Sequence, residues 1–430
     1  MKKNKKEICE QAISVALEIE NGRDQAVVLA EIASFVSQQG DGEWAEKIYL
    51  QAITAVENIS DDRVFKTTSL GEVAEIISKD ENFPKQKEFF KKLIKIAESI
   101  ENRALRHSAL AVISKCLGDR GEFSWALEVI KKIDKGAFKA SSLAGIAESL
   151  AAKGKFEEAF KIVEKIGRGL HDRSVSLSGI ASLLADNRNF QESQKVYEKA
   201  VRTAEKVMGN SDKSLSLSTI ACSLAQKGNF EKALAVAEKI EQSLFKVRTL
   251  AGIAQVLICS RKEEESLKIY TQALEISRRI EDDWRRACAL LALLNSSCGS
   301  FNFNQALDVA SEIEDNYCRS QGLLAIVNAY IEADDISSAL KIAETITEGL
   351  FKVQALLASS KALALKHKFE EAFKVSTEIE DFYYKAEALE GIVKGLAEEK
   401  EFEQALEVLK KIEDKYCQAR SFLNIARALS

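Results

Sequence analysis

Apolar residues return along this chain at the spacing of one face of an α-helix. In the run Leu217, Ile220, Ala221 and Leu224, apolar or small residues stand at offsets 0, +3, +4 and +7. These offsets fall on one side of a helix that turns every 3.6 residues. Since the run recurs throughout the chain, its first residue serves as the anchor from which offsets are counted. The anchors are Leu29, Leu70, Leu110, Leu143, Leu177, Leu217, Leu250, Leu290, Leu323, Leu356, Leu389 and Phe422.

Each anchor run is followed by a break and then by a second apolar run. Glycine stands at offset +11 in several repeats, as at Gly40 and Gly121, and suits the left-handed residue that ends a helix. Offset +13 is Phe in eight of eleven repeats, and offset +16 is Ala in eight. Apolar or small residues follow at +20 and +23, so each repeat predicts a helix, a turn and a second amphipathic helix. The small residues at +4 and +16 should let the two helices approach closely.

The repeats fall into two length classes. Some neighbouring anchors are 33 or 34 residues apart, and the others are 40 or 41 apart. Seven extra residues make about two helical turns. Because they fall after offset +20, we expect the second helix to lengthen without losing its phase. Each long repeat carries an aromatic residue at +20, namely Tyr49, Phe90, Tyr197 and Tyr270.

This order of residues resembles the tetratricopeptide repeat (TPR) family. The resemblance covers the chain from about residue 8 to residue 430. It implies an all-α fold, a right-handed α-solenoid of about eleven TPR-like helix-turn-helix repeats with 33- and 40-residue units. The proline that usually closes a TPR unit is missing throughout. An acidic turn such as Ile379-Glu380-Asp381 replaces it.

The chain begins and ends within a repeat. We expect a single domain over residues 1–430, with an N-terminal half-repeat (1–22), eleven full repeats (23–420) and a C-terminal half-repeat (421–430). Ala12 and Ala16 fit a second helix that lacks its first, while Phe422 and Ala426 fit a first helix that lacks its second. The last helix would then expose Phe422, Leu423 and Leu429. Head-to-tail self-association would cover them, and ends that fray are the alternative.

Offset −4 carries a cation in ten of twelve units, and glutamine in the first and last, Gln25 and Gln418. A cation near a helix N-terminus opposes the helix dipole. We interpret the column as a ladder of ion pairs with the acidic turns, and a ligand-binding role is the alternative. The cations are Lys66, Arg106, Lys139, Arg173, Lys213, Lys246, Arg286, Arg319, Lys352 and Lys385.

The offset +5 column contains the candidate binding residues. In TPR proteins the matching face of the first helix lines the concave groove, and related proteins use Asn and Lys there to hold peptides. By this resemblance an acidic extended segment would be held by Asn295, Asn328, Lys361, Lys394 and Arg427. Asparagine can donate to and accept from a backbone, and a cation can pair with a carboxylate. A solvated polar face is the alternative, and the nearby Glu387 and Glu390 would partly neutralise the cations.

Composition narrows the function classes. The net charge is −5, which disfavours a general nucleic-acid binder. The eight cysteines, Cys298 among them, form no CxxC pair, so we expect buried thiols in a reducing compartment rather than a metal site. The charged N-terminus does not resemble a signal peptide, and no apolar run is long enough to span a bilayer.

These observations favour a cytoplasmic, non-enzymatic scaffold without a cofactor, which binds an unknown protein or acidic peptide. We find no phosphate-binding loop, nucleophile elbow or HExxH motif in the chain. Two alternatives remain open: a self-assembling solenoid and an RNA-binding helical repeat. An RNA-binding repeat would need a basic groove, and the acidic residues Glu75 and Glu148 in the +5 column disfavour one.

Overall fold

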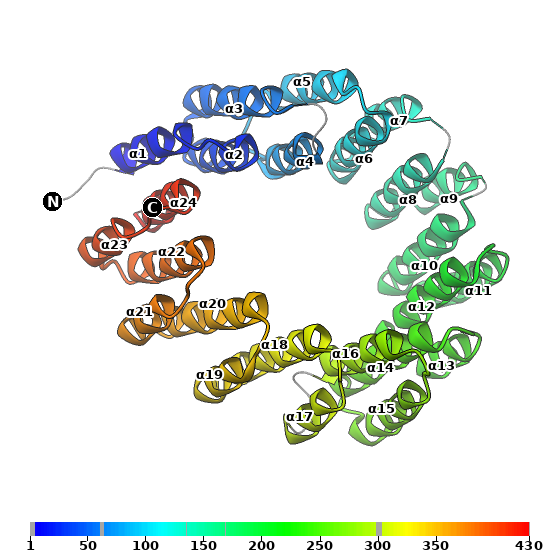
Figure 1. The fold of residues 1–430 in the computed structure, drawn as a ribbon. Coiled ribbons are helices and arrows are strands. Elements are labelled where there is room, and N and C mark those ends of the chain that lie inside the picture. The colour runs from blue at the N-terminus through cyan, green and yellow to red at the C-terminus, as the bar shows by residue number, and fades with distance from the viewer. Residues whose placement is uncertain (1–4, 61–63, 135, 168, 298–302, 430) are drawn as a thin grey trace. The chain divides into compact units, whose positions relative to one another are not determined.

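A computed structural model describes residues 5–60, 64–134, 136–167, 169–297 and 303–429 of the chain. All regular structure in these segments is helical, in twenty-four helices (Figure 1). The predicted all-α helical-repeat fold is therefore confirmed. Its handedness and the number of repeats stay predictions.

The helices alternate between first and second helices of the predicted repeats. The first helices are α2 (Gly22–Gln38), α4 (Val64–Lys79), α6 (Arg103–Asp119), α8 (Ala137–Ala152), α10 (Leu170–Asp186), α12 (Asn210–Gln226), α14 (Ser243–Cys259), α16 (Asp283–Ser297), α18 (Asn316–Glu332), α20 (Gly349–Leu365), α22 (Phe382–Glu398) and α24 (Lys415–Ala428). The second helices are α1 (Lys5–Leu17), α3 (Gly42–Glu57), α5 (Gln86–Ser99), α7 (Phe123–Lys131), α9 (Phe156–Glu164), α11 (Phe190–Ala204), α13 (Phe230–Glu238), α15 (Glu263–Arg278), α17 (Phe303–Ser311), α19 (Ile336–Thr345), α21 (Phe369–Thr377) and α23 (Phe402–Leu409).

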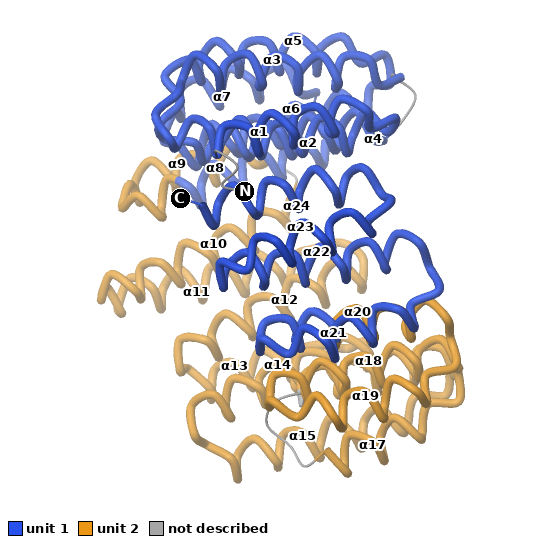
Figure 2. Tube along the Cα trace, turned by 90° about the vertical axis from the view of Figure 1, so that its left-hand side faces the viewer, with its two compact units in different colours: residues 1–149, 360–430 blue, residues 150–359 orange. Residues whose placement is uncertain are grey.

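The chain divides into two compact units (Figure 2). Unit 1 contains residues 1–149 and 360–430, and unit 2 contains residues 150–359. The divisions fall inside α8 and α20. Within unit 2, the first helices from α10 to α18 stack on one another in sequence order. The expectation of a single domain over 1–430 stays a prediction.

The two helices of a repeat meet at offsets +4 and +16. Ala221 and Ala233, which stand at these offsets in one repeat, are both fully buried. At two of the positions where serine replaces alanine, its hydroxyl reaches the backbone of the other helix: Ser193 Oγ donates to the carbonyl of Ala181 at 2.7 Å, and Ser360 Oγ to that of Ala372 at 2.9 Å. A short side chain can make this bond only where the two backbones lie close together, as the sequence predicted.

The turn between the two helices has a left-handed residue at offset +11. Among the residues that the structure describes, nine repeats have a positive φ there, at Gly40, Gly121, Gly154, Arg188, Gly228, Arg261, Asp334, His367 and Lys400. The next N–H then bonds back to the carbonyl at +7, as from Asn229 to Leu224 at 2.9 Å. This is the Schellman arrangement, which satisfies carbonyls that the helix leaves unpaired. The prediction from glycine is confirmed, although five of the nine residues are not glycine.

The second helices have the two predicted lengths. In the long repeats α3, α5, α11 and α15 contain 14 to 16 residues. In the short repeats α7, α9 and α13 contain 9 residues each. The aromatic side chains at +20 of the long repeats are buried. Tyr49 also donates to the buried carboxylate of Asp80 at 2.8 Å, so this residue has a polar partner as well as a packing role.

The terminal half-repeats pack against each other within unit 1. Helix α1 lies along α24, and α24 also contacts α2. Lys415 of α24 pairs with Glu18 at 3.0 Å, and Arg420 lies 3.7 Å from Glu31 of α2. Helix α1 therefore stands where the second helix of the last repeat would stand.

This pairing corrects the expected exposure of the last helix. Leu423 is fully buried, and Phe422 and Leu429 are half-buried, because α1 and α2 pack beside them. Helix α24 begins at Lys415, six residues before the expected half-repeat at 421–430. Asp414 fixes that start, since its carboxylate accepts the N–H of Cys417 at 2.8 Å. Head-to-tail association between molecules stays a prediction.

Candidate functional sites

The five predicted binding residues lie on first helices of both units. Asn295 on α16 and Asn328 on α18 belong to unit 2. Lys361 on α20, Lys394 on α22 and Arg427 on α24 belong to unit 1. Because two units carry these residues, each group is described by itself.

The two asparagines stand at the same offset of directly stacked first helices. Both side chains are exposed. Within the described residues neither amide has a hydrogen-bond partner. Stacked helices lie about 8–10 Å apart. The pair therefore presents two amides that can each donate and accept.

The cations of unit 1 have carboxylate neighbours. Lys361 pairs with Glu387 of α22 at 2.6 Å, and Lys394 lies 3.9 Å from Glu398. Both sites thus keep a local charge near neutrality. An acidic ligand at Lys361 would have to compete with Glu387, which agrees with the partial neutralisation expected from the sequence.

A buried carboxylate lies beside Arg427. Glu390 is 6 % exposed, and Arg420 Nε and Asn424 Nδ2 approach its Oε1 at 3.5 and 3.4 Å. Its Oε2 has no hydrogen-bond partner among the described residues. Burial raises the pKa of Glu390, and the charges of Arg420 and Lys361 oppose this shift. The cluster joins α22, α24 and, through Glu31, α2, so it serves the packing of first helices.

Several of the offset −4 cations bond to the ends of the preceding second helices. Arg106 Nη1 donates to the carbonyl of Ile100 at 2.9 Å, Lys139 Nζ to that of Ile133 at 2.9 Å, and Arg286 Nη1 to that of Ile280 at 3.2 Å. A cation at a helix C-terminus satisfies its free carbonyls and its dipole. Part of the column therefore consists of helix caps, and Lys66 makes the same bond to the carbonyl of Glu57 at 3.2 Å.

The ion-pair interpretation therefore holds for part of the column and is wrong for Arg106 and Lys139. Lys213, Lys246 and Arg286 do pair with Glu241, Glu238 and Asp283, at 3.4, 2.5 and 2.6 Å. The acidic residue before several first helices has another role, because its carboxylate caps that helix, as Asp381 accepts from the N–H of Tyr384 at 3.0 Å.

The two glutamines in the column form the same cap without a charge. Gln25 Nε2 donates to the carbonyl of Ile19 at 3.2 Å, and Gln418 Nε2 donates to that of Ile412. A neutral amide is enough to make the bond.

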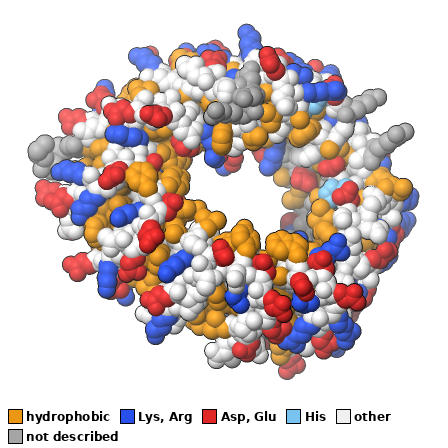
Figure 3. Space-filling model, viewed as in Figure 1, with side chains coloured by type: hydrophobic (Ala, Val, Ile, Leu, Met, Phe, Trp, Pro, Cys, Tyr) orange, Lys and Arg blue, Asp and Glu red, His pale blue; other side chains and the backbone are white. Residues whose placement is uncertain are grey.

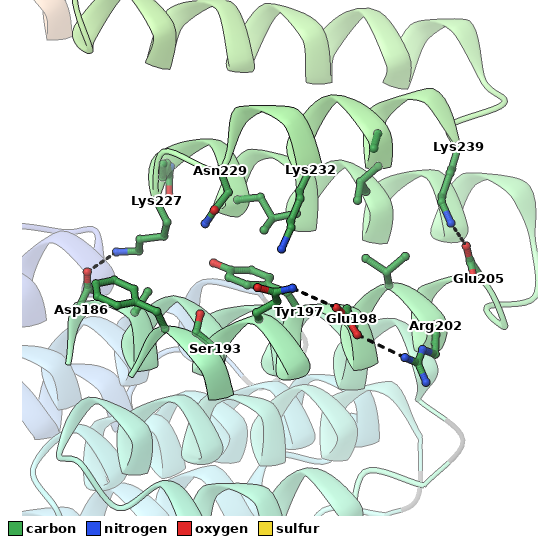
Figure 4. A pocket seen from close by; sticks show the side chains of 18 residues that line it. Asp186, Ser193, Tyr197, Glu198, Arg202, Glu205, Lys227, Asn229, Lys232 and Lys239 are labelled. Carbon is green, nitrogen blue, oxygen red and sulfur yellow. Dashed lines mark hydrogen bonds and ion pairs between the residues drawn. The ribbon is translucent and has the colours of Figure 1, made fainter. Parts of the chain in front are cut away.

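Sequence reasoning missed a cleft between two second helices of unit 2. The cleft lies between α11, a long helix, and α13, a short one (Figure 4). Its volume is about 710 Å³. Each helix packs on α12, but they do not pack closely on each other. The only sequence signal for the cleft is the step from a long to a short repeat.

Apolar side chains line this cleft between two ion pairs. Tyr197, Val201 and Val236 form part of its wall, and Phe190 at its edge is 67 % exposed. Lys227 pairs with Asp186 at 2.6 Å at one end. At the other end Lys239 pairs with Glu205 at 2.5 Å. Each pair joins the α10–α11 side to the α12–α13 side, so the cleft is bounded along its length (Figure 4).

The cysteines are more varied than expected. Cys9, Cys116, Cys318 and Cys417 are buried thiols, and burial raises the pKa of Cys9 and Cys116 to about 11. Cys222 and Cys288 are half-buried, and Cys259 is exposed. Cys298 lies outside the described residues. In the part of the chain that the structure covers, no three His, Cys, Asp or Glu side chains gather as metal ligands would.

The surface carries both charge signs close together. On the face drawn in Figure 3, basic and acidic side chains are interspersed rather than separated by sign. None of the described helices combines the length and apolar character needed to cross a membrane.

One repeat matches a known family. Residues 174–212, which span α10, α11 and the start of α12, match the sequence model of the tetratricopeptide repeat. The search of curated proteins found no match. The matched segment is one of the long repeats, and its second helix forms one wall of the cleft.

Several solved structures are similar to parts of the chain. Ton1535 from Thermococcus onnurineus NA1 is 20% identical over 73% of this chain and 97% of its own, with a TM-score of 0.30. A circular tandem repeat protein is 14% identical over 97% and 96%, with a TM-score of 0.22. A STAND protein with a tetratricopeptide repeat sensor, PH0952 from Pyrococcus horikoshii, is 14% identical over 93% and 68%, with a TM-score of 0.30. With TM-scores this low, none of them bears on the arrangement of the repeats. The chain is an all-α helical repeat protein, and one of its repeats, residues 174–212, matches the tetratricopeptide repeat.

Proposed function

We propose that this chain is a non-enzymatic scaffold that binds an extended segment of a partner protein along its first helices. Proteins with TPR-like repeats generally mediate protein interactions or act as scaffolds. The observation that carries the proposal is the pair of exposed amides at Asn295 and Asn328, at the same place on stacked helices.

The spacing of the two amides suits an extended backbone. Neighbouring first helices lie about 8–10 Å apart, and an extended chain advances about 3.3 Å per residue. Asn295 and Asn328 would therefore hold backbone groups about three residues apart. Each amide both donates and accepts, so the contact depends little on the partner's side chains.

Lys361, Lys394 and Arg427 would add selectivity for an acidic segment. Their carboxylate neighbours Glu387 and Glu398 reduce that contribution, because a ligand must displace or share each pairing. We therefore expect the asparagines to contribute more to affinity than the cations.

Affinity capture with two sets of variants tests this order. The wild-type chain, the variant Asn295→Ala/Asn328→Ala and the variant Lys361→Glu/Lys394→Glu/Arg427→Glu are each incubated with a lysate of the native host. Mass spectrometry then compares the captured proteins. We expect a protein captured by the wild type to be lost with the asparagine variant and to be reduced with the cation variant.

Two controls decide the reading of this experiment. Glu332→Ala changes an exposed residue at the end of α18 outside the +5 column and should capture as the wild type does. Circular dichroism must show equal helix content for all variants. Equal capture by the wild type and the asparagine variant would place the binding surface elsewhere and reject the clamp.

A further inference from the structure

One cation among the described residues that line the cleft between α11 and α13 has no counter-charge. Lys227, Lys239 and Arg202 each lie within ion-pair distance of an acidic residue, with Arg202 3.5 Å from Glu198. Lys232 extends from α13 into the cleft toward the ring of Tyr197 (Figure 4). Among the described residues no carboxylate lies within ion-pair distance of its ammonium group. Among the described residues that line the cleft, Lys232 is therefore the one cation without an acidic partner, and it lies among apolar side chains and the polar side chains of Ser193 and Asn229.

The boundaries of the cleft limit what can occupy it. An extended chain running through it would have to break both Lys227–Asp186 and Lys239–Glu205, which join its two sides. Side chains that enter from the open mouth would leave both pairs intact. A volume of about 710 Å³ has room for several such side chains.

We propose that this cleft is a docking site for the apolar face of an amphipathic helix from a partner protein, with an acidic residue of that helix at Lys232. A helix laid over the mouth can project apolar side chains at i, i+3, i+4 and i+7 against Tyr197, Val201 and Phe190. It would bury the exposed ring of Phe190, which stabilises the complex. The acidic residue supplies the charge that the cleft lacks.

The length of α11 sets the length of the partner. Fifteen residues span about 22 Å at 1.5 Å per residue, so a helix of similar length covers the cleft. This site lies on second helices, whereas the proposed asparagine contacts lie on first helices. It shares with the proposed function only the premise that the ligand is a polypeptide.

A phage-displayed library of helix-forming peptides about as long as α11 tests the site. The peptides carry apolar residues at helical spacing and random residues elsewhere, and selection uses the full-length protein. We expect enriched peptides to share an acidic residue on the apolar face. Their affinity, measured by fluorescence polarisation, should fall about tenfold or more with Lys232→Glu and with Phe190→Ala.

The side chains of Lys232 and Phe190 are both exposed, so neither Lys232→Glu nor Phe190→Ala should disturb the fold. Lys199→Glu, an exposed residue of α11 that does not line the cleft, is the matched control and should leave affinity unchanged. Replacing the peptide's acidic residue by lysine should restore binding to the Lys232→Glu protein. That rescue separates a direct charge contact from a general loss of structure.

Three outcomes would overturn the proposal. The first is that no peptide is enriched, and the second is that enriched peptides bind Lys232→Glu and Phe190→Ala as well as the wild type. The third is that dodecanoate binds with a dependence on Lys232 while no peptide does, which would make the cleft a site for small apolar carboxylates. None of these results affects the Asn295→Ala/Asn328→Ala experiment, so the two proposals can fail separately.

Discussion

Five residues that carry a side chain hold a left-handed backbone at the end of a first helix. Lys400 is one of them, with a φ of 64°, and Gly228 stands at the same offset with a φ of 76°. Glycine adopts this conformation without steric cost, whereas other residues are strained in it. The turns therefore share one geometry, but those without glycine carry backbone strain that the glycine turns do not.

Replacing Lys400 by glycine should stabilise the protein. The left-handed conformation costs an L-residue roughly 1 kcal/mol, and glycine removes this strain from the folded state. Glycine also makes the unfolded chain more flexible, which stabilises the unfolded state and offsets part of the gain. We expect Lys400→Gly to raise the free energy of unfolding by about 0.5 kcal/mol, measured as a higher urea midpoint.

The neighbouring residue is the matched control for this change. Glu399 has an ordinary φ of −78°, so Glu399→Gly gains nothing in the folded state and should lower the midpoint. An unchanged or lower midpoint for Lys400→Gly would mean that its left-handed backbone carries no strain.

At the scale of elements, the offset −4 side chain joins the end of one second helix to the start of the next first helix. Arg106 makes this link through the carbonyl of Ile100, and Gln418 makes it without charge. Hydrogen bonding, rather than charge pairing, therefore accounts for the link at these two positions.

Two substitutions at Arg106 should therefore differ in their effect on the free energy of unfolding. Arg106→Gln should keep most of the stability, because the amide can bond the same carbonyl. Arg106→Ala should lose about 1 kcal/mol, since the carbonyl is left without a donor. Urea unfolding at low and high salt measures both effects, and neither should depend strongly on salt.

Lys246 provides the contrast, because its ammonium pairs with Glu238 at 2.5 Å. Lys246→Gln should lose part of the stability at low salt and less at high salt, since salt screens an exposed pair. If Arg106→Gln behaved as Lys246→Gln does, the ion-pair interpretation of the whole column would regain its support.

The sequence predicted the helices and turns better than it predicted the cleft and the ion pairs between helices. Apolar spacing located both helices of each repeat, and the glycines at +11 located the turn, because these depend on residues close together in the chain. The cleft beside α11 depends on how far two neighbouring second helices separate, which no local pattern encodes. The structure places the +5 asparagines on exposed helix faces, and their role in binding stays a prediction. The neutralising effect of Glu387 was expected from the sequence, but its pairing with Lys361 in particular depends on how α20 and α22 pack.

At the scale of the whole molecule, the ends of the chain were predicted to complement each other, and in the structure they meet within one chain. Complementary ends can pair within a molecule or between molecules, and the sequence alone does not distinguish the two. Ends carried by one chain meet at an effective concentration that dilution of the protein does not lower. Pairing within the chain should therefore dominate in dilute protein.

Carbodiimide coupling distinguishes the two arrangements, because it joins an amine to a carboxylate that it already contacts. Lys415 and Glu18 lie 3.0 Å apart and should yield one cross-linked peptide. In a mixture of unlabelled and ¹⁵N-labelled protein, this peptide should be wholly light or wholly heavy if the contact forms within one chain. Lys85 and Glu46, 2.8 Å apart, are the internal control. A mixed-isotope peptide for Lys415 and Glu18, but not for the control, would establish head-to-tail pairing and make the closed contact in unit 1 the minor form.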